Sequence, residues 1–297
     1  MPSLKAIRTR ITSVKNTRKI TRAIKLVSTA KLKRAQDALV AARPYSAAIS
    51  KVVSELSVVA GTDAHPLFEE RTPNKVAIVV MTSDRGQAGA FNANVTKTVE
   101  RHIAAELAER EVSLRIIGRK GNQYFSRRKV PITSFDIAPT GATALEVARD
   151  MANKIIDDFQ AKKVDRVYLV YNEFKSAISQ ATKVMQILPV VPEQQPKPEG
   201  QAGHGHVATT LPDYTYEPSK EELLTRLVPL YVQIQLYRAG LESIAAFFAA
   251  QATAMEAATK NAGEMVSRLT LQYNRARQAS ITKELLEIIG GAEALKG

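Results

Sequence analysis

The loop from Thr82 to Asn92 has the residue types and spacing closest to those of a chemical site. It follows a predicted strand and precedes a predicted helix, a position where glycine-rich loops bind phosphate through backbone N–H groups. Gly86 and Gly89 lie in this loop, but the G-x-G-x-x-G spacing and the Lys-Ser/Thr pair of phosphate loops are missing. We expect a turn in which an Asp or Asn side chain caps the helix, and a nucleotide-binding enzyme stays as an alternative.

Other residues suited to catalysis or metal binding are scarce in the sequence. The chain has no cysteine, so it has no thiol nucleophile, disulfide or Cys-ligated metal. His204 and His206 lie in a stretch rich in Pro, Gly and Gln, where one histidine pair lacks a third ligand. Asp157 and Asp158 are adjacent in a predicted helix, so their carboxylates diverge. We therefore expect no catalytic, cofactor-binding or metal-binding residues.

The C-terminal end combines long hydrogen-bond donors with large apolar side chains. Arg277 and Gln278 are donors suited to acceptors on a partner protein. The apolar residues that follow them are Ile281, Leu285, Leu286, Ile288, Ile289 and Leu295. An uncovered apolar end of this size would promote aggregation. We expect a partner to enclose it.

A heptad pattern fills the last quarter of the chain. From Leu223 to Ala279, the positions reached by steps of four and three are apolar or alanine, except Gln251 and Gln272. A period of 3.5 residues is typical of helices that supercoil around a partner helix. As one helix, Ser219 to Leu295 would be roughly 115 Å long, which is too long for a compact domain. The pattern predicts a coiled-coil helix over 219–297.

A second long helix is predicted over residues 1–60, where Pro44 is the interior helix breaker. Its apolar stripe changes face: one side carries Leu4, Ile7, Ile11 and Val14, and roughly the opposite side carries Ile20, Ile24 and Val27. This segment has thirteen Lys and Arg against Asp37 and Glu55, a net charge of +11, whereas the other residues carry +2. The charge suits an acidic protein partner, a nucleic acid or a mitochondrial transit peptide, and a solvated face is the simplest alternative.

The centre of the sequence, residues 74–191, alternates between strand and helix patterns. Strands are predicted at Val76–Met81, Leu114–Ile117, Val167–Tyr171 and Thr182–Val190, and helices at Asn92–Arg110 and Thr143–Gln160. This order predicts an α/β domain around a mainly parallel sheet. Residues 192–218 are predicted to form a linker, because they are polar and rich in Pro, Gly and Gln.

These elements define the expected fold class. It is an α/β fold in which a Rossmann-like domain is inserted between two terminal segments that pair as a long antiparallel two-helix coiled coil. The best candidate for a membrane span, Ile244–Ala258, is too short and is interrupted by Gln251. We expect contact with a membrane only through partner proteins.

Four segments resemble the gamma subunit of F-type ATP synthase. They are Ile20–Ser28 (ITRAIKLVS), Thr82–Gly86 (TSDRG), Tyr214–Pro218 (YTYEP) and Arg277–Thr282 (RQASIT). The resemblance covers essentially the whole chain from Ser3 onward, and its C-terminal segment is the most specific. Because it begins at Ser3, it argues against a transit peptide.

The resemblance implies the central-stalk rotor shaft of the synthase. In that family an antiparallel coiled coil passes up a ring of three alpha and three beta subunits, and the α/β domain sits against the epsilon subunit and the c-ring. Proton-driven rotation of the c-ring is thereby coupled to ATP synthesis or hydrolysis at the beta sites. The implied location is the cytoplasmic side of the bacterial inner membrane, as a peripheral, non-catalytic subunit.

The resemblance also implies partner contacts, residue by residue. Contacts with beta loops near the tip match Arg277, Gln278 and Thr282. Contacts with the acidic C-terminal loop of beta match Arg85, Arg22, Ile24 and Lys25. The c-ring foot matches Tyr216 and Glu217. This chain has Gln87-Ala88 where relatives often have Leu-Cys, and the thiol regulation of chloroplast relatives is not expected without cysteines.

A basic coiled-coil protein that binds nucleic acid is the main alternative. It would explain the charge and the long helices, but not the apolar C-terminal end or the inserted α/β domain. We expect no nucleic-acid partner.

Overall fold

The computed structural model describes residues 3–61, 65–191 and 219–294. The predicted linker 192–218, with the c-ring foot residues Tyr216 and Glu217, lies outside these residues, as does Leu295. The chain divides into two compact units. We call residues 31–250 the α/β unit, and residues 1–30 with 251–297 the terminal unit.

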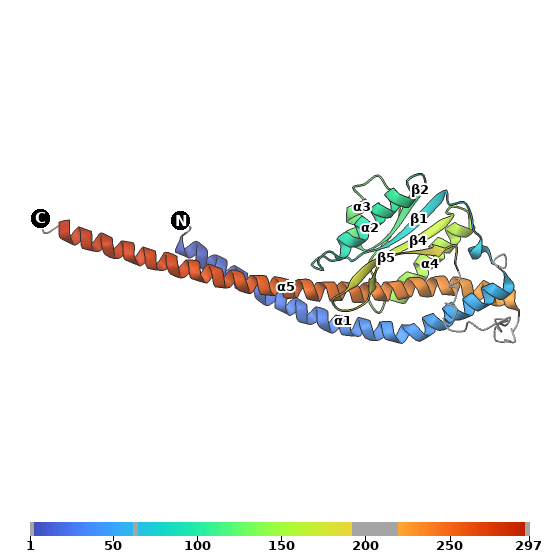
Figure 1. Ribbon diagram of the computed structural model, residues 1–297, viewed down its shortest axis with the longest axis horizontal. Coiled ribbons are helices and arrows are strands. Elements are labelled where there is room, and N and C mark those ends of the chain that lie inside the picture. The colour runs from blue at the N-terminus through green and yellow to red at the C-terminus, as the bar shows by residue number, and fades with distance from the viewer. Residues whose placement is uncertain (1–2, 62–64, 192–218, 295–297) are drawn as a thin grey trace, which may run out of the picture. The chain divides into compact units, whose positions relative to one another are not determined.

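The helices and strands follow the predicted alternation, with additional short elements (Figure 1). In chain order they are α1 (Leu4–Ala60), the 3-10 helix η2 (Pro66–Phe68), β1 (Lys75–Met81), α2 (Phe91–Glu106), β2 (Glu111–Ile117), α3 (Arg119–Phe125), β3 (Ile132–Asp136), α4 (Ala144–Gln160), β4 (Arg166–Phe174), β5 (Gln180–Leu188) and α5 (Lys220–Ala294). The sequence did not predict η2, α3 or β3. Helix α1 continues through Pro44.

The described strands form one sheet in the order β3-β2-β1-β4-β5. The pairs β1–β2, β1–β4 and β2–β3 are parallel, whereas β5 runs antiparallel to β4. The predicted mainly parallel sheet is therefore confirmed. Strand β3 escaped prediction because it is short and only half buried, so that its apolar pattern is weak.

Helices cover both faces of the sheet. Alternate residues of each central strand point to opposite faces, so each strand contributes to two cores. On β1, Val76, Ile78 and Val80 pack with α2 and α3 in one apolar core. The intervening residues of β1, from Ala77 to Met81, pack with α4 and with segments of α1 and α5 in a second core. Both cores are apolar, so the strands read as nearly continuous apolar runs.

Helix α5 carries two apolar faces in the α/β unit. The face that packs into the second core consists of Leu224, Val228, Val232, Leu236 and Ala239. Another face contacts α1, where Leu241 packs against Leu39 and the pair Ala245 and Ala249 packs against Leu32. The heptad positions are divided between the two faces, because Leu223 and Leu227 pack beside the second core whereas Leu241 contacts α1.

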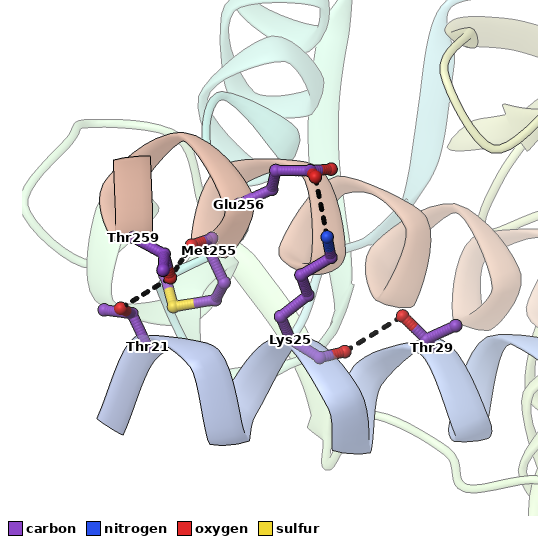
Figure 2. Close-up of polar contacts among 6 residues, drawn as sticks. All are labelled: Thr21, Lys25, Thr29, Met255, Glu256 and Thr259. Atoms are coloured by element: carbon purple, nitrogen blue, oxygen red, sulfur yellow. Dashed lines mark hydrogen bonds and ion pairs between the residues drawn. The ribbon is translucent and has the colours of Figure 1, made fainter. Parts of the chain in front are cut away.

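The helices α1 and α5 are antiparallel in both units. In the α/β unit, Leu39 lies beside Leu241, and farther along α1 the Gln235 amide donates to Ser50 Oγ at 3.3 Å. In the terminal unit, Thr21 Oγ1 lies 2.7 Å from Thr259 Oγ1, and the Lys25 ammonium lies 2.6 Å from Glu256 Oε1 (Figure 2). From one contact to the next, the residue number on α1 rises as the residue number on α5 falls. The predicted antiparallel pairing of the two ends is confirmed.

Replacing Leu236 with Ala tests the sheet-facing side of α5. Leu236 is 0% exposed, so the substitution should lower the free energy of unfolding by about 2–5 kcal/mol. Urea unfolding followed by tyrosine fluorescence measures this change. Leu271→Ala is the control, because Leu271 is 52% exposed and its loss should change the free energy of unfolding by less than about 0.5 kcal/mol. Equal effects of the two substitutions would contradict the assigned packing.

Candidate functional site

The loop between β1 and α2 is held by the chain's own hydrogen bonds. Thr82 Oγ1 donates to Ile117 O at 3.0 Å and accepts from Gly121 N at 2.9 Å. Ser83 N donates to Asn92 Oδ1 at 2.9 Å. The polar groups of this loop therefore serve to fix its shape, which is the ordinary role of a strand-to-helix turn.

Asp84 caps a different helix from the one predicted. Its Oδ1 accepts from Arg119 N at 2.9 Å and from Ala138 N at 3.2 Å, so it serves the first turn of α3. Helix α2 begins after Ala90, which makes no side-chain cap. The expectation that an Asp or Asn caps α2 was wrong. The sequence did not predict α3, and the Asp84 side chain caps that helix instead.

Arg85 is the one predicted partner contact that lies on this loop, and its side chain is exposed. The Ser83 hydroxyl donates to the Arg85 carbonyl at 2.6 Å, and the loop backbone turns at Gln87, which has a φ of 64°. Because the backbone on both sides is fixed, the guanidinium leaves the surface from a defined point. A fixed base of this kind suits docking onto an acceptor of another protein.

The ligand crevice typical of this fold is filled by α5. In doubly wound sheets, ligands bind beside the carboxyl ends of the strands where the strand order reverses, and here that point lies between β1 and β4. Ala246 of α5 is fully buried there, packed with Ala88 and Phe91. The Phe91 and Phe247 rings meet edge to face at 5.5 Å between centroids. A protein helix occupies the position that a nucleotide would need.

A buried polar group beside the sheet also has a structural explanation. Glu242 is buried and accepts from Arg238 Nε at 3.0 Å, one helical turn away on α5. Burial, with a contribution from the Glu242 carboxylate, raises the pKa of Tyr171. A perturbed pKa can mark an active site, but here the Glu242 carboxylate is paired with the Arg238 guanidinium of the same helix. Across residues 3–61, 65–191 and 219–294, no group of three or more His, Asp or Glu could hold a metal ion.

The terminal unit presents the predicted tip residues to solvent. Arg277, Gln278 and Thr282 are all exposed on α5, and Gln278 and Thr282 are neighbours on one face because they are four residues apart. In the contacts Thr21–Thr259 and Lys25–Glu256, the residue number on α1 and the residue number on α5 add to about 280. Arg277 therefore lies opposite the start of α1, and α5 continues past that point (Figure 1).

The continuing part of α5 is the most apolar exposed segment of the terminal unit. Its exposed large side chains are Ile281, Leu285, Leu286, Ile288 and Ile289. With Arg277 and Gln278 just before them, they form an apolar end bordered by hydrogen-bond donors. We call residues 277–289 the projecting end. Its composition is that of a surface covered by another protein.

The basic face of α1 differs from the expectation in one respect. Arg22 is exposed and Ile24 is half buried, but Lys25 is ion-paired with Glu256 across the helix pair (Figure 2). Ile20 and Val27, by contrast, are exposed, which agrees with the predicted change of apolar face. The pairing of Lys25 could not be read from the sequence, because it depends on the register between segments 231 residues apart.

The predicted contacts thus fall on separate surfaces. Arg22 is level with about residue 258 of α5 along the helix pair, so Arg277 lies ~28 Å farther along that helix at 1.5 Å per residue. Arg85 belongs to the α/β unit. None of the described helices has a stretch both long enough and apolar enough to cross a lipid bilayer.

Known proteins resemble this chain along its whole length. A family model described as ATP synthase matches residues 3–295. Proteins named ATP synthase gamma chain from Geobacter metallireducens and from Anaeromyxobacter sp. strain Fw109-5 are 44% and 48% identical to it, and each alignment covers 100% of both chains.

Solved structures show the same fold. A chain from the central stalk and c-ring structure of the Tetrahymena thermophila mitochondrial ATP synthase has a TM-score of 0.59 at 25% identity, over 80% of this chain and 99% of that chain. A chain from the Euglena gracilis mitochondrial ATP synthase has a TM-score of 0.63 at 18% identity, over 98% of this chain and 94% of that chain.

Replacing Gly118 with Ala tests whether the loop that carries Arg85 depends on a glycine contact. Gly118 has a φ of +102°, and an added Cβ would overlap the Thr82 carbonyl. Strain and overlap together should lower the free energy of unfolding by about 2–5 kcal/mol. Gly141→Ala is the control, since nothing lies within 4 Å of its added Cβ. Thermal unfolding of both variants measures the difference, and a Gly118 variant as stable as the Gly141 variant would contradict this role.

Proposed function

This chain belongs to the ATP synthase gamma-chain family, and from that membership we propose that it is the shaft that couples c-ring rotation to ATP synthesis and hydrolysis at the beta-subunit sites. It is a subunit of the synthase and part of the central stalk. The observation that carries the proposal is the antiparallel pairing of α1 with α5, together with the projecting end that continues past α1.

In this proposal the shaft helices are residues 1–60 and 219–297, the globular domain is 74–191 and the linker is 192–218. The projecting end lies inside the ring of three alpha and three beta subunits. The globular domain and Tyr216 and Glu217 lie towards the epsilon subunit and the c-ring. The complex lies on the cytoplasmic side of the bacterial inner membrane, and this chain meets the membrane through those partners.

The chain contributes mechanics and no active site. An asymmetric shaft can shift a beta site between conformations only as far as its faces bind those conformations differently. The terminal unit has such asymmetry, because basic Arg22 and apolar Ile20 and Val27 lie exposed on α1 while α5 is rich in alanine. The filled crevice of the sheet supports a non-catalytic role, because α5 occupies the usual ligand position.

We propose an acidic protein as the partner of the exposed basic side chains. The acidic C-terminal loop of beta would meet Arg22, Ile24, Lys25 and Arg85. Lys25 is already paired with Glu256, so its contribution depends on exchanging that partner, whereas Arg22 and Arg85 are exposed. Nucleic acid is not proposed, because residues 1–30 contain no aromatic side chain on which bases could stack.

The double substitution Arg277→Ala/Gln278→Ala tests the tip contacts. Removing both donors should lower ATP turnover of the assembled, coupled complex about tenfold, which corresponds to ~1.4 kcal/mol. Circular dichroism of the isolated chain should show unchanged helicity, because both side chains are exposed.

The matched control is Gln272→Ala/Arg275→Ala, which removes the same residue types from exposed positions slightly earlier on α5. It should keep turnover within about twofold of the unsubstituted complex. Normal turnover in the Arg277/Gln278 variant, or an equal loss in the control, would count against the assigned contacts.

A further inference from the structure

Polar contacts join α1 and α5 at successive turns of the terminal unit. Ser28 Oγ donates to Gln251 Oε1 at 2.8 Å, Lys25 Nζ lies 2.6 Å from Glu256 Oε1, and Thr21 Oγ1 lies 2.7 Å from Thr259 Oγ1. Figure 2 shows the last two pairs bridging the helices. In all three pairs the residue numbers add to 279–281, so the contacts describe a single axial alignment.

The most buried of these pairs, Ser28–Gln251, interrupts an apolar seam. Gln251 occupies a heptad position and is 9% exposed, while Ser28 is 1% exposed. The Ser28 hydroxyl also lies 2.8 Å from Ile24 O, so its one proton is shared between its own helix and Gln251. A buried polar pair of this kind contributes little net stability, because desolvation offsets most of the hydrogen bond.

Apolar packing in the terminal unit specifies alignment weakly. Its buried apolar side chains among the described residues are Ile7, Met255, Ala262 and Leu269, and three further seam positions of α5 there are alanine: Ala258, Ala276 and Ala279. Sliding one helix by seven residues would again place small or apolar side chains along the seam. Within the terminal unit, apolar packing alone therefore permits several alignments of similar stability.

A shift of seven residues would break every polar contact at once. If each α1 residue met a residue seven places later on α5, Ser28 would face Ala258, Lys25 would face Gly263 and Thr21 would face Val266. Ser28, Lys25 and Thr21 would then have no cross-helix polar partner. The polar pairs therefore separate one alignment from the others more strongly than the apolar seam does.

We propose that these three pairs, of which Ser28–Gln251 is the most buried, are positioning residues that fix the axial register between α1 and α5 in the terminal unit. They thereby determine how far α5 continues past α1, and so where residues 277–289 stand along the helix pair. A polar residue at a single seam position is known to specify register at a cost in stability. This register is a property of the chain alone and does not depend on the partner contacts of the projecting end.

Distance measurement between two spin labels tests the register directly. The chain has no cysteine, so Ser13→Cys/Ser267→Cys supplies the labelling sites in the full chain. Both positions are exposed, and their numbers add to 280. The labelled chain should give a single narrow distance by pulsed electron spin resonance. Sliding by seven residues would change the axial offset by ~10 Å.

Gln251→Leu is the decisive variant, because it makes the seam apolar without removing packing volume. Without the hydrogen bond between Ser28 and residue 251, the distance distribution should split or widen, because part of the population would slide by ~10 Å along the helix axis, while the melting temperature stays the same or rises. A residue that mattered only for stability would behave in the opposite way, with a lower melting temperature and one unchanged distance.

Charge exchange provides a second variant in case Gln251→Leu does not fold. Lys25→Glu places two carboxylates together and should broaden the distribution, and Lys25→Glu/Glu256→Lys should restore the narrow distance. Lys33→Glu is the matched control, because Lys33 pairs with Asp37 on its own helix at 3.0 Å. It should leave the distance unchanged.

The outcomes are exclusive. Splitting or broadening in Gln251→Leu supports the register role, and an unchanged narrow distance in that variant overturns it. If only the charge variants fold, broadening with recovery in the exchanged pair supports the role. An unchanged distance in Lys25→Glu, or broadening that the exchange does not reverse, overturns it.

Discussion

The packing of α1 against α5 is the constraint on which the rest of this molecule depends, because it joins the two ends of the chain. Residues as far apart as Lys25 and Glu256, 231 positions in the sequence, meet across this pair. The α/β domain lies between them in the sequence, so both helices enter and leave one folded unit. Apolar contacts such as Leu39 with Leu241 hold the pair in the α/β unit. Polar contacts add to a thinner apolar seam in the terminal unit.

The same helix fills the position where folds of this kind usually bind ligands. Ala246 and Phe247 of α5 pack against the loop that follows β1, and Phe174 at the end of β4 borders three apolar clusters shared with the long helices. The carboxyl edge of the sheet thus serves as a seat for α5. A second face of α5, from Leu224 to Ala239, packs into the core beneath the sheet. At this edge the sheet binds a helix of its own chain in the position where related folds bind a ligand.

Patterns that repeat over many residues were readable from the sequence. The heptad seam, the basic first helix and the central β–α alternation follow from periodicity and charge. The antiparallel pairing follows from the two long helices lying at opposite ends of the sequence, on either side of one domain. Contacts that depend on three-dimensional register were not readable. Asp84 caps α3, which is a seven-residue helix with little periodic signal, and Lys25 finds Glu256 only once the two ends are aligned. The sheet-facing stripe of α5 was hidden because a heptad reading follows one face of a helix at a time.

Partner contacts are the part of the site that a single chain specifies least. Exposure of Arg22, Arg85, Arg277 and Gln278 agrees with a docking role, but exposure alone describes many surface residues. Lys25 illustrates the difference, since its charge has a partner within the chain. The residues that carry the family resemblance are therefore informative because their identity and their placement agree.

The stretch of α5 beyond the start of α1 has a thermodynamic consequence. Residues 278–294 extend α5 past the start of α1, and a helical extension without tertiary packing gains little stability per residue in water. Its order is worth little until a surface surrounds it. Entry into a close-fitting sleeve would therefore complete the winding of this segment, and the conformational entropy given up at that moment would subtract from the affinity gained by covering its leucines and isoleucines.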